Sequence, residues 1–419
     1  MATGRATDQA LASRLQDGIY HDQATPSSYR LLLLNVKPAT GRAEARTAIA
    51  RVWAMLQELR ARDLATDVRP DPPAARRPDP PPRKGAYGRS KTRAAPELTC
   101  LLGFGASLFD RYSRMPRPDG LLRLGHGPFP KIRWVAQADR QPGEADLALQ
   151  FIAWTELAVN RAVAEVWMMI VEQFLPLEIV ALHGGFNRED KRSWIGFHDG
   201  ISNIEFHRRP EVIAATSKQP AWMEGGTHMA FFRLAIDLER WRRLPLQTQE
   251  ILVGRDKLTG CPLDPVGAGL PISRKGCPIW GDRAFGREHI SPATPPMAAK
   301  VLRASHMHRA NPNRDPQNAD DPIREEDNRI FRQGYEFLEQ LHDGRLRLGL
   351  NFVSFQGATS RVRNMLSKDG WLGDVNFGGF PFAEPGAPGP IVFVEMIAGG
   401  YYAVPPKGDP HSFPGVSIF

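Results

Sequence analysis

The chain has 419 residues, 42% of them hydrophobic and 24% charged, so it can build one large double domain or two to three ordinary ones. Its net charge of +8 accompanies no RRM, KH or zinc-finger signature, and we therefore expect no nucleic-acid partner. Only three cysteines occur, Cys100, Cys261 and Cys277, which argues against a disulfide framework and favours a reducing compartment.

The N-terminal residues carry neither an apolar signal core nor a twin-arginine pair. No run of the sequence approaches the roughly 18 apolar residues that a membrane span needs. We therefore expect a cytoplasmic protein that makes no contact with a membrane.

The first half of the sequence predicts an alternation of strands and helices around one insertion. Short apolar runs indicate strands over Tyr29–Val36, Glu97–Leu102 and Asp146–Ala153. Apolar residues at helical spacing indicate helices from Arg42 to about Arg62 and over Glu156–Leu175. Residues 67–96 are rich in proline and basic side chains and cannot form a packed element, which is typical of a basic surface insertion.

The second half repeats this rhythm less clearly. Strands are expected over Thr227–Leu234 and Leu348–Phe355, and a helix over Arg329–His342. Strands spaced in this way, with helices on one side, favour an α+β architecture of two halves. We place the first half at residues 1–215, with the Gly-Phe-His-Asp-Gly loop near its end, and the second half at residues 216–419.

Three segments carry residue types suited to chemistry, although each alone has a plainer explanation. Asp199 lies between the glycines of segment 196–200, a pattern that usually marks a turn. Arg332 lies on the expected helix, where a buried guanidinium would need an anion or a bound oxygen ligand. His306 and His308 form a His-x-His pair that could hold zinc or another divalent metal, but no clear third ligand follows them.

In this order, these segments resemble the dye-decolorising peroxidases, a family of haem enzymes. The most specific parts are Gly-Phe-His-Asp-Gly at 196–200 and Ser-His-Met-His-Arg-Ala-Asn-Pro at 305–312. Further similar landmarks run along nearly the whole chain: YRLLLLNV at 29–36, LTCLLGFGASLF at 98–109, GRDKLTG at 254–260 and GGYYAVPP at 399–406. The resemblance implies two ferredoxin-like halves with antiparallel sheets and peripheral helices, and haem b held mainly by the C-terminal half.

The resemblance also implies roles for individual residues, carried over from the matching motifs. His306 is expected to be the axial ligand of the haem iron. Asp199 and Arg332 are expected to be catalytic on the distal face of the haem, with Asn203 helping to hold water or peroxide there. The remaining expected haem contacts are Gly200, Arg309, Leu350 and Phe352, of which the last two form an apolar wall.

The expected chemistry uses hydrogen peroxide as the oxidant and an organic electron donor, such as a dye or a phenolic compound. Cleavage of peroxide requires a proton to move between its oxygens while negative charge is stabilised. Asp199 would move this proton and Arg332 would stabilise the charge, so a carboxylate base predicts faster turnover at acidic pH. Family members often assemble, and we also expect a homo-oligomer.

The sequence departs from the family pattern near these residues. Ile204 and Glu205 follow Asn203 where the family often has proline, and Glu336-Phe337 stands where many members have Pro-Tyr. Both departures bear on the access channel and therefore on the donor. Three alternatives stay open: a haem-handling protein that stores, transfers or demetallates the cofactor, a dedicated haem oxidase of a biosynthetic pathway, and a metal hydrolase.

Overall fold

The computed structural model describes a large part of the chain, and the predicted insertion at residues 67–96 lies outside it. The described residues are 11–19, 25–61, 98–124, 133–188, 190–200, 203–204, 209–215, 219–260, 263, 305–307, 329–366, 393–409 and 411–419.

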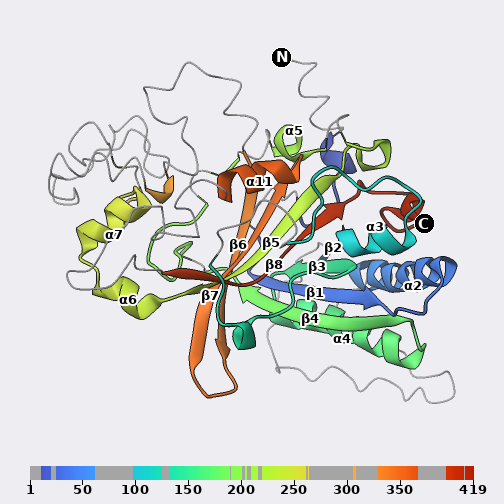
Figure 1. The fold of residues 1–419 in the computed structure, drawn as a ribbon, viewed down its shortest axis with the longest axis horizontal. Coiled ribbons are helices and arrows are strands. Elements are labelled where there is room, and N and C mark those ends of the chain that lie inside the picture. Colours follow the sequence, from blue (N-terminus) through green and yellow to red (C-terminus); the bar gives the residue numbers. More distant parts are fainter. Residues whose placement is uncertain are drawn as a thin grey trace, which may run out of the picture.

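The first half forms a four-stranded antiparallel sheet with two long helices packed on it. Its elements are β1 (Ser28–Val36), α2 (Arg42–Ala61), β2 (Thr99–Gly105), α3 (Ala106–Tyr112), β3 (Leu147–Ala153), α4 (Glu156–Glu172) and β4 (Leu177–Phe186). The strand order β4-β1-β3-β2 is that of a ferredoxin-like fold. Helices α2 and α4 lie against each other and α4 packs on β1 and β3 (Figure 1). The strands and helices predicted here are confirmed within a few residues at their ends.

The second half repeats this arrangement. Its elements are β5 (Thr227–Ile236), α6 (Leu238–Arg243), α7 (Leu246–Val253), β6 (Phe331–Gln340), β7 (Leu346–Gln356), α11 (Thr359–Leu366) and β8 (Val394–Val404), and the short helix α5 (Arg209–Ile213) before them packs on β6 and β7. Strands β5 and β7 are central, and the order β8-β5-β7-β6 matches that of the first half. The predicted fold of two ferredoxin-like halves with antiparallel sheets is confirmed.

The two sheets join along both edges into a closed barrel, a feature that the sequence did not predict. One seam is short, with Phe104 opposite Ala403 and Gly105 opposite Tyr402. At the other seam Phe186 of β4 faces Glu336 of β6. Figure 1 shows the strands of the first half crossing those of the second where the sheets meet. At these seams the outer strands of the two sheets pair with each other, which covers part of the edges that would otherwise be open to pairing with other chains.

Alternation along the strands sorts the apolar side chains into two cores. Residues such as Tyr29, Phe231 and Tyr335 point into the barrel and pack together there, and the Tyr29 and Tyr335 rings stack with centroids 4.3 Å apart. The opposite side of each strand packs under the helices and connecting segments, where Phe151 and Phe232 lie in the larger core. The outward face of the second sheet, which carries Phe232, therefore points away from the barrel interior.

The helix predicted over Arg329–His342 is wrong, because this segment forms strand β6. Its burial alternates at the start of the strand, with Phe331, Gln333 and Tyr335 buried and the residues between them less so. The aromatic residues of FRQGYEFLEQ, Phe331, Tyr335 and Phe337, are separated by even numbers of positions, as the two-residue period of a strand requires. Pairing with β7 over the whole length of β6 decides the conformation.

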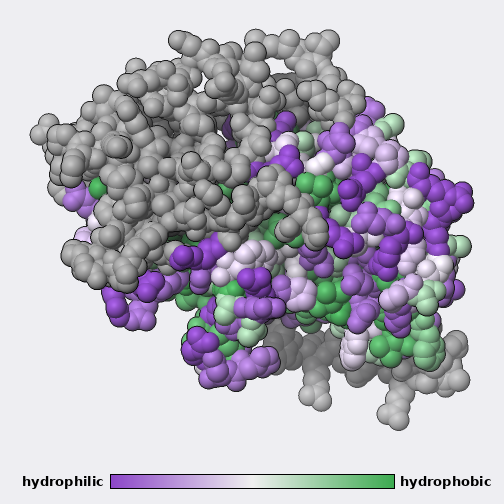
Figure 2. All heavy atoms as spheres, viewed as in Figure 1, coloured by the Kyte–Doolittle hydropathy of each residue, from purple (hydrophilic) through white to green (hydrophobic). Residues whose placement is uncertain are grey.

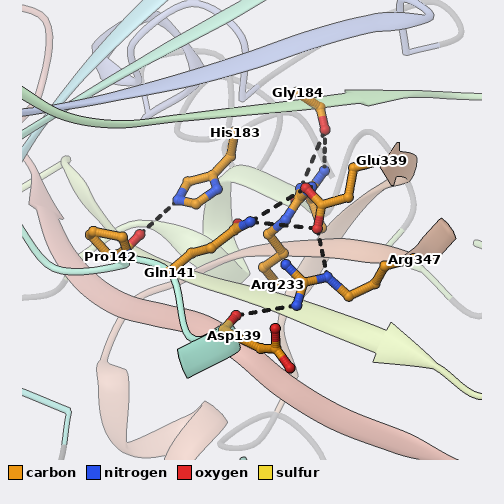
Figure 3. Close-up of polar contacts among 9 residues, drawn as sticks. Asp139, Gln141, Pro142, His183, Gly184, Arg233, Glu339 and Arg347 are labelled. Carbon is orange, nitrogen blue, oxygen red and sulfur yellow. Dashed lines mark hydrogen bonds and ion pairs between the residues drawn. The ribbon is translucent and has the colours of Figure 1, made fainter. Parts of the chain in front are cut away.

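A buried network of charges lies inside the second half, near the far end of β6 (Figure 3). Arg233 of β5 is 4% exposed, and its Nη2 donates to Oε2 of Glu339 at 2.8 Å while Nη1 donates to Oδ1 of Asn351 at 2.6 Å. Arg347 of β7 donates from Nε to the other Glu339 oxygen at 2.7 Å. One carboxylate therefore balances two guanidinium groups and ties three strands together.

His183 of β4 extends this network to the segment that precedes β3 (Figure 3). Its Nε2 lies 2.7 Å from the carbonyl oxygen of Pro142, so this nitrogen carries the proton and donates it. Burial, together with the charge of Arg233, lowers the pKa of His183 to about 4. The ring is therefore neutral near pH 7 and serves as a structural donor.

The part of the described surface that Figure 2 shows is mostly polar. On the face drawn in Figure 2, hydrophilic side chains cover most of the described area and apolar ones form small separate patches. Within the described ranges, no helix combines the length and the apolar character that crossing a membrane requires.

Candidate active site

The loop that carries Asp199 leaves the end of β4 and is shaped by its own backbone. The N–H of Asp199 donates to the carbonyl of Lys191 at 2.8 Å, and the N–H of Gly196 donates to the carbonyl of Ser193 at 2.8 Å. Oδ1 of Asp199 accepts the N–H of Gly200 at 2.6 Å. The carboxylate is exposed among the described residues, and none of them comes within 4 Å of the Cβ position at Gly200.

Arg192 fastens this loop to the segment after α7. Its Nη1 donates to the carbonyls of Gly196 and Lys257 at 2.7 Å each, and its Nη2 donates to the carbonyl of Leu258 at 2.8 Å. Three carbonyls from two segments thus share one guanidinium, which fixes the loop against the second half. The sequence offered no signal for this role, since Arg192 belongs to no recognised motif.

Asn203 pairs with the backbone of Arg332 at the start of β6. Its Nδ2 donates to the carbonyl oxygen of Arg332 at 2.6 Å, and its Oδ1 accepts the Arg332 N–H at 3.0 Å. The Asn203 side chain thus bonds both backbone groups of Arg332, as a neighbouring strand would, and so fixes the position of Arg332. The expectation that Asn203 also holds water or peroxide stays a prediction.

Asp199 and Gly334 meet where the loop crosses β6. A Cβ atom at residue 334 would lie 2.7 Å from Oδ2 of Asp199 and 3.3 Å from Cδ1 of Leu350. Contacts below about 3 Å between such atoms are sterically excluded, so only glycine leaves this space to the carboxylate. Gly334 therefore belongs to the site, although the sequence analysis did not name it.

Leu350 and Phe352 of β7 form the apolar part of the same face. In the β6–β7 register, Gly334 faces Phe352 and Glu336 faces Leu350. Phe352 also faces Phe232 of β5, and the two rings stack with centroids 6.0 Å apart and an interplanar angle of 18°. Arg332 lies two residues before Gly334 on β6, opposite Ser354, so the guanidinium, the glycine and the apolar wall share one side of the sheet.

His306 approaches this face from the segment that packs on the end of α7. Gly254 ends α7 with φ of +84°, and a Cβ there would lie 2.4 Å from Oγ of Ser305 and 3.2 Å from Cβ of Met307. Glycine is needed at this position both for the left-handed backbone and for the close approach. The predicted landmark at residues 254–260 thus supports the segment 305–307.

The electrostatics place His306 near Arg332. Part of the residue stays accessible, but desolvation of its ring lowers the pKa of His306 to about 3, and the positive charges of Arg332 and Arg255 contribute to this shift. An imidazole of this kind is neutral at physiological pH, which is the form that binds metal ions. The pKa of His198, the residue before Asp199, is also lowered by burial and by the charge of Arg192, whereas the charge of Asp190 raises it.

Glu336 is a buried carboxyl group that the sequence analysis noted only as a departure from the family pattern. It lies two residues after Gly334 on the same side of β6 and is 5% exposed. Burial raises the pKa of Glu336 to about 7; the negative charges of Asp199 and Asp190 add to this rise, and the Trp194 backbone and Arg188 act against it. The signal for it was the alternation Arg332, Gly334, Glu336, which becomes visible only once the segment is recognised as a strand.

The structure therefore brings together most of the residues that the sequence singled out. Asp199 and Leu350 meet at Gly334, Asn203 contacts Arg332, and His306 lies within reach of the Arg332 charge. Arg309 and His308 lie outside the described residues. Among the described residues, no cluster of three or more His, Cys, Asp or Glu side chains could hold a metal ion.

Comparison with known families decides the classification. Residues 190–409 match the family model described as "Dyp-type peroxidase, C-terminal". The chain belongs to the Dyp-type peroxidase family. The matched part begins in the loop that carries Asp199 and includes all four strands of the second half.

Solved structures of Dyp-type peroxidases share this fold. The enzyme from Cellulomonas bogoriensis superposes with a TM-score of 0.64 at 22% identity, covering 97% of this chain and 96% of the other. The enzyme from Streptomyces coelicolor gives a TM-score of 0.62 at 21% identity, covering 97% of both chains. A DypB variant from Rhodococcus jostii, solved in complex with heme, gives 0.59 at 16% identity over 93% of this chain and 96% of the other.

Curated relatives are named deferrochelatase. That of Shigella flexneri serotype 5b is 26% identical over 279 residues, covering 63% of this chain and 58% of the relative. That of Escherichia coli O157:H7 is 25% identical over 342 residues, covering 78% of this chain and 69% of the relative. The chain thus spans less than two thirds of the length of the first of these proteins.

Proposed function

We propose that this chain is a haem peroxidase that reduces hydrogen peroxide and oxidises an organic donor, with haem b bound through His306. The observation that supports this most is that Asp199 and Arg332 lie on one side of the second sheet, with His306 close enough for the Arg332 charge to lower its pKa. These residues come from three segments far apart in the sequence, and each is positioned by contacts of its own.

The residues present fit a haem. Leu350 and the half-buried Phe352, which stacks on Phe232 beneath it, supply an apolar surface suited to a macrocycle, and Gly334 keeps the strand backbone open beside it. His306 offers a neutral imidazole nitrogen, the donor used by many haem proteins. The DypB variant of Rhodococcus jostii was solved in complex with heme, which supports the same cofactor here. Gly200 and Arg309 complete the haem contacts that we propose.

When bound, haem would supply an iron atom with a position open to peroxide. Asp199 is exposed at the loop tip, where its carboxylate can accept a proton from peroxide and return it to the leaving oxygen. Arg332 would direct its guanidinium toward the developing negative charge. Asn203 holds the Arg332 backbone on both sides, so the guanidinium is positioned before peroxide arrives.

Dyes and phenolic compounds are the donors that we propose. Assembly into a homo-oligomer, a cytoplasmic location and the division into residues 1–215 and 216–419 belong to the same proposal. A molar-mass measurement in solution tests the assembly. Limited proteolysis between β4 and β5 tests the division.

The direct test uses full-length protein loaded with haem. Peroxide consumption and dye oxidation are compared for the wild type, Asp199→Asn and Arg332→Leu, with Asp343→Asn in the exposed β6–β7 turn as the control. Each distal variant should lose about 100-fold or more in peroxide turnover while still binding haem. The control should match the wild type. Equal turnover in all four proteins would contradict the roles of Asp199 and Arg332.

The name of the curated relatives favours a second candidate, a protein that handles haem without peroxidase turnover. The two candidates differ in the fate of bound haem. Incubation of the haem-loaded protein without peroxide, followed by measurement of free iron and of the metal-free porphyrin, separates them. Release of iron with an intact porphyrin would support haem handling, whereas retention of iron with rapid peroxide consumption would support the peroxidase.

A further inference from the structure

Glu336 lies at the seam of the barrel, and its carboxyl group has no side-chain partner among the described residues. It faces Phe186 of β4 on one side and Leu350 of β7 on the other, and both are apolar. Within the described part of the chain its two carboxyl oxygens are buried without a full hydrogen bond, although the Trp194 backbone lies close enough to lower its pKa. A buried carboxylate left unpaired is costly, so the group must be protonated or serve a purpose.

Asp199 is one of the charged groups close to Glu336. Oδ2 of Asp199 lies over Gly334, and Glu336 is the next residue on the same side of β6. Residues two apart along a strand stand about 7 Å apart, which one bridging water or the flexible Glu336 side chain can span. The charge of Asp199 contributes to the raised pKa of Glu336, in agreement with this arrangement.

We propose that Glu336 is a proton-exchange partner of Asp199, holding a proton in the buried seam and passing it to and from the Asp199 carboxylate. This inference rests on the proposed function, in which Asp199 moves the proton of peroxide. Glu336 acts through Asp199 and touches neither peroxide nor haem, so it is a positioning residue. The exchange is balanced: a proton leaves the Glu336 carboxyl as the Asp199 carboxylate gains one, and the reverse step restores both.

The charges around Glu336 fit this role. Arg188 and Asp190, which pair with each other through two hydrogen bonds, lie on the segment that follows β4. Their opposite charges partly cancel at Glu336, where Arg188 lowers the pKa and Asp190 raises it. Asp199 remains as the charged group on the other side. At neutral pH, Glu336 is therefore close to half protonated, the condition in which a group exchanges protons most readily.

The role makes a specific prediction for the pH dependence of turnover. Below pH 7 Glu336 keeps its proton and can supply it, whereas above pH 7 it becomes a second negative charge beside Asp199. Turnover of the wild type should therefore fall as the pH rises through neutrality. Glu336→Gln should remove this limb of the profile, and Glu336→Asp should restore a limb, since it returns a carboxyl group.

The experiment combines that profile with a titration that needs neither haem nor peroxide. Full-length protein with carbon-13 in the glutamate side-chain carboxyls is titrated by NMR as wild type, Glu336→Gln and Asp199→Asn. One carboxyl signal should titrate near pH 7, be missing in Glu336→Gln, and titrate at lower pH in Asp199→Asn than in the wild type. The same variants, with Glu336→Asp, are then loaded with haem and assayed for peroxide consumption across pH.

The two readouts separate this inference from the proposed function. A Glu336 signal that titrates in the usual range of glutamate, or that ignores Asp199→Asn, would overturn the proposal. So would an active Glu336→Gln whose pH profile matches the wild type. If the protein consumes no peroxide while the two carboxyls remain coupled in the titration, the proposed function fails and the pairing of Glu336 with Asp199 stands.

Discussion

The carboxylate of Asp199 lies over Gly334, at a point where a single methyl group would come within 2.7 Å of Oδ2. This relationship joins the loop after β4 to the second strand of the other sheet. A substitution at residue 334 can therefore move the Asp199 carboxylate, the proposed proton-transfer group, while Asp199 itself is kept.

Gly334→Ala should displace Asp199 and leave the fold intact. The obstructed atom is the end of a flexible side chain, which can move aside at little cost to stability, but the carboxylate then leaves its position over β6. We expect haem binding to be kept and peroxide consumption to fall about 100-fold. Steady-state kinetics with a thermal unfolding curve measures both.

The control for this variant is Gly408→Ala. Residue 408 has a backbone compatible with alanine, and the nearest atom to an added Cβ would lie at 3.6 Å, an ordinary contact. Its kinetics should match the wild type. Full activity of Gly334→Ala would mean that the Asp199 carboxylate is not needed where the structure places it.

Asn203 should prove essential for the position of Arg332. Asn203→Ala removes both hydrogen bonds to the Arg332 backbone, which we expect to lower the free energy of unfolding by about 1 to 2 kcal/mol. Asn203→Asp keeps the size of the side chain but sets an oxygen against the Arg332 carbonyl, so it should be no better than alanine. Chemical denaturation gives the stability, and peroxide kinetics should fall together with it.

The buried network around Arg233 should contribute to stability and not to chemistry. Glu339→Gln leaves two guanidinium groups without their shared carboxylate, and we expect a loss of roughly 2 to 4 kcal/mol. Arg233 and Arg347 hold the pKa of Glu339 below its usual value against the effect of burial. The contribution is therefore present above about pH 4.5 and lost as the pH falls through the lowered pKa in the folded state.

Denaturation of Glu339→Gln across pH checks this account. The difference from the wild type should be largest near neutral pH and shrink in acid. Asp343→Asn removes an exposed carboxylate from the neighbouring turn and should leave stability unchanged, because solvent screens its pair with Arg345. A Glu339→Gln protein as stable as the wild type at pH 7 would contradict the role of the network.

Glu336 should affect stability in the opposite direction. The pKa of Glu336 is raised in the folded state. Between about pH 4.5 and 7 the unfolded chain therefore loses this proton while the folded chain keeps it, and the free energy of unfolding falls as the pH rises. Glu336→Gln removes that cost, which amounts to something on the order of 3 kcal/mol above pH 7. Its unfolding free energy relative to the wild type should therefore rise between pH 4.5 and 7 and level off above. A constant difference across this range would show that Glu336 titrates normally.

The elements that sequence could predict are those whose pattern is local. The apolar run of β1 and the helical spacing of α2 decide those elements without help from distant residues. Segment 329–342 was mistaken for a helix because its conformation depends on pairing with β7, and the closed barrel depends on two seams between segments far apart in the chain. Both are tertiary effects that a local pattern does not contain.

The candidate site divides in the same way. Asp199, Arg332 and His306 were named because they fall in motifs of a resembling family. Gly334 and Glu336 derive their meaning from the alternation of β6, which a helix would have placed on other faces. Arg192 donates to backbone carbonyls of two segments, and every residue has a backbone carbonyl, so the sequence could not indicate these contacts.

The central claim, that Asp199 moves a proton of peroxide at a haem bound through His306, is tested most directly by one spectroscopic measurement. Haem-loaded wild type and Asp199→Asn are mixed rapidly with one equivalent of hydrogen peroxide, and the haem absorption is followed. The account predicts a fast spectral change in the wild type that a reducing dye reverses, slowed about 100-fold or more in the variant. Simple bleaching of the wild type, or equal rates in the two proteins, would contradict it.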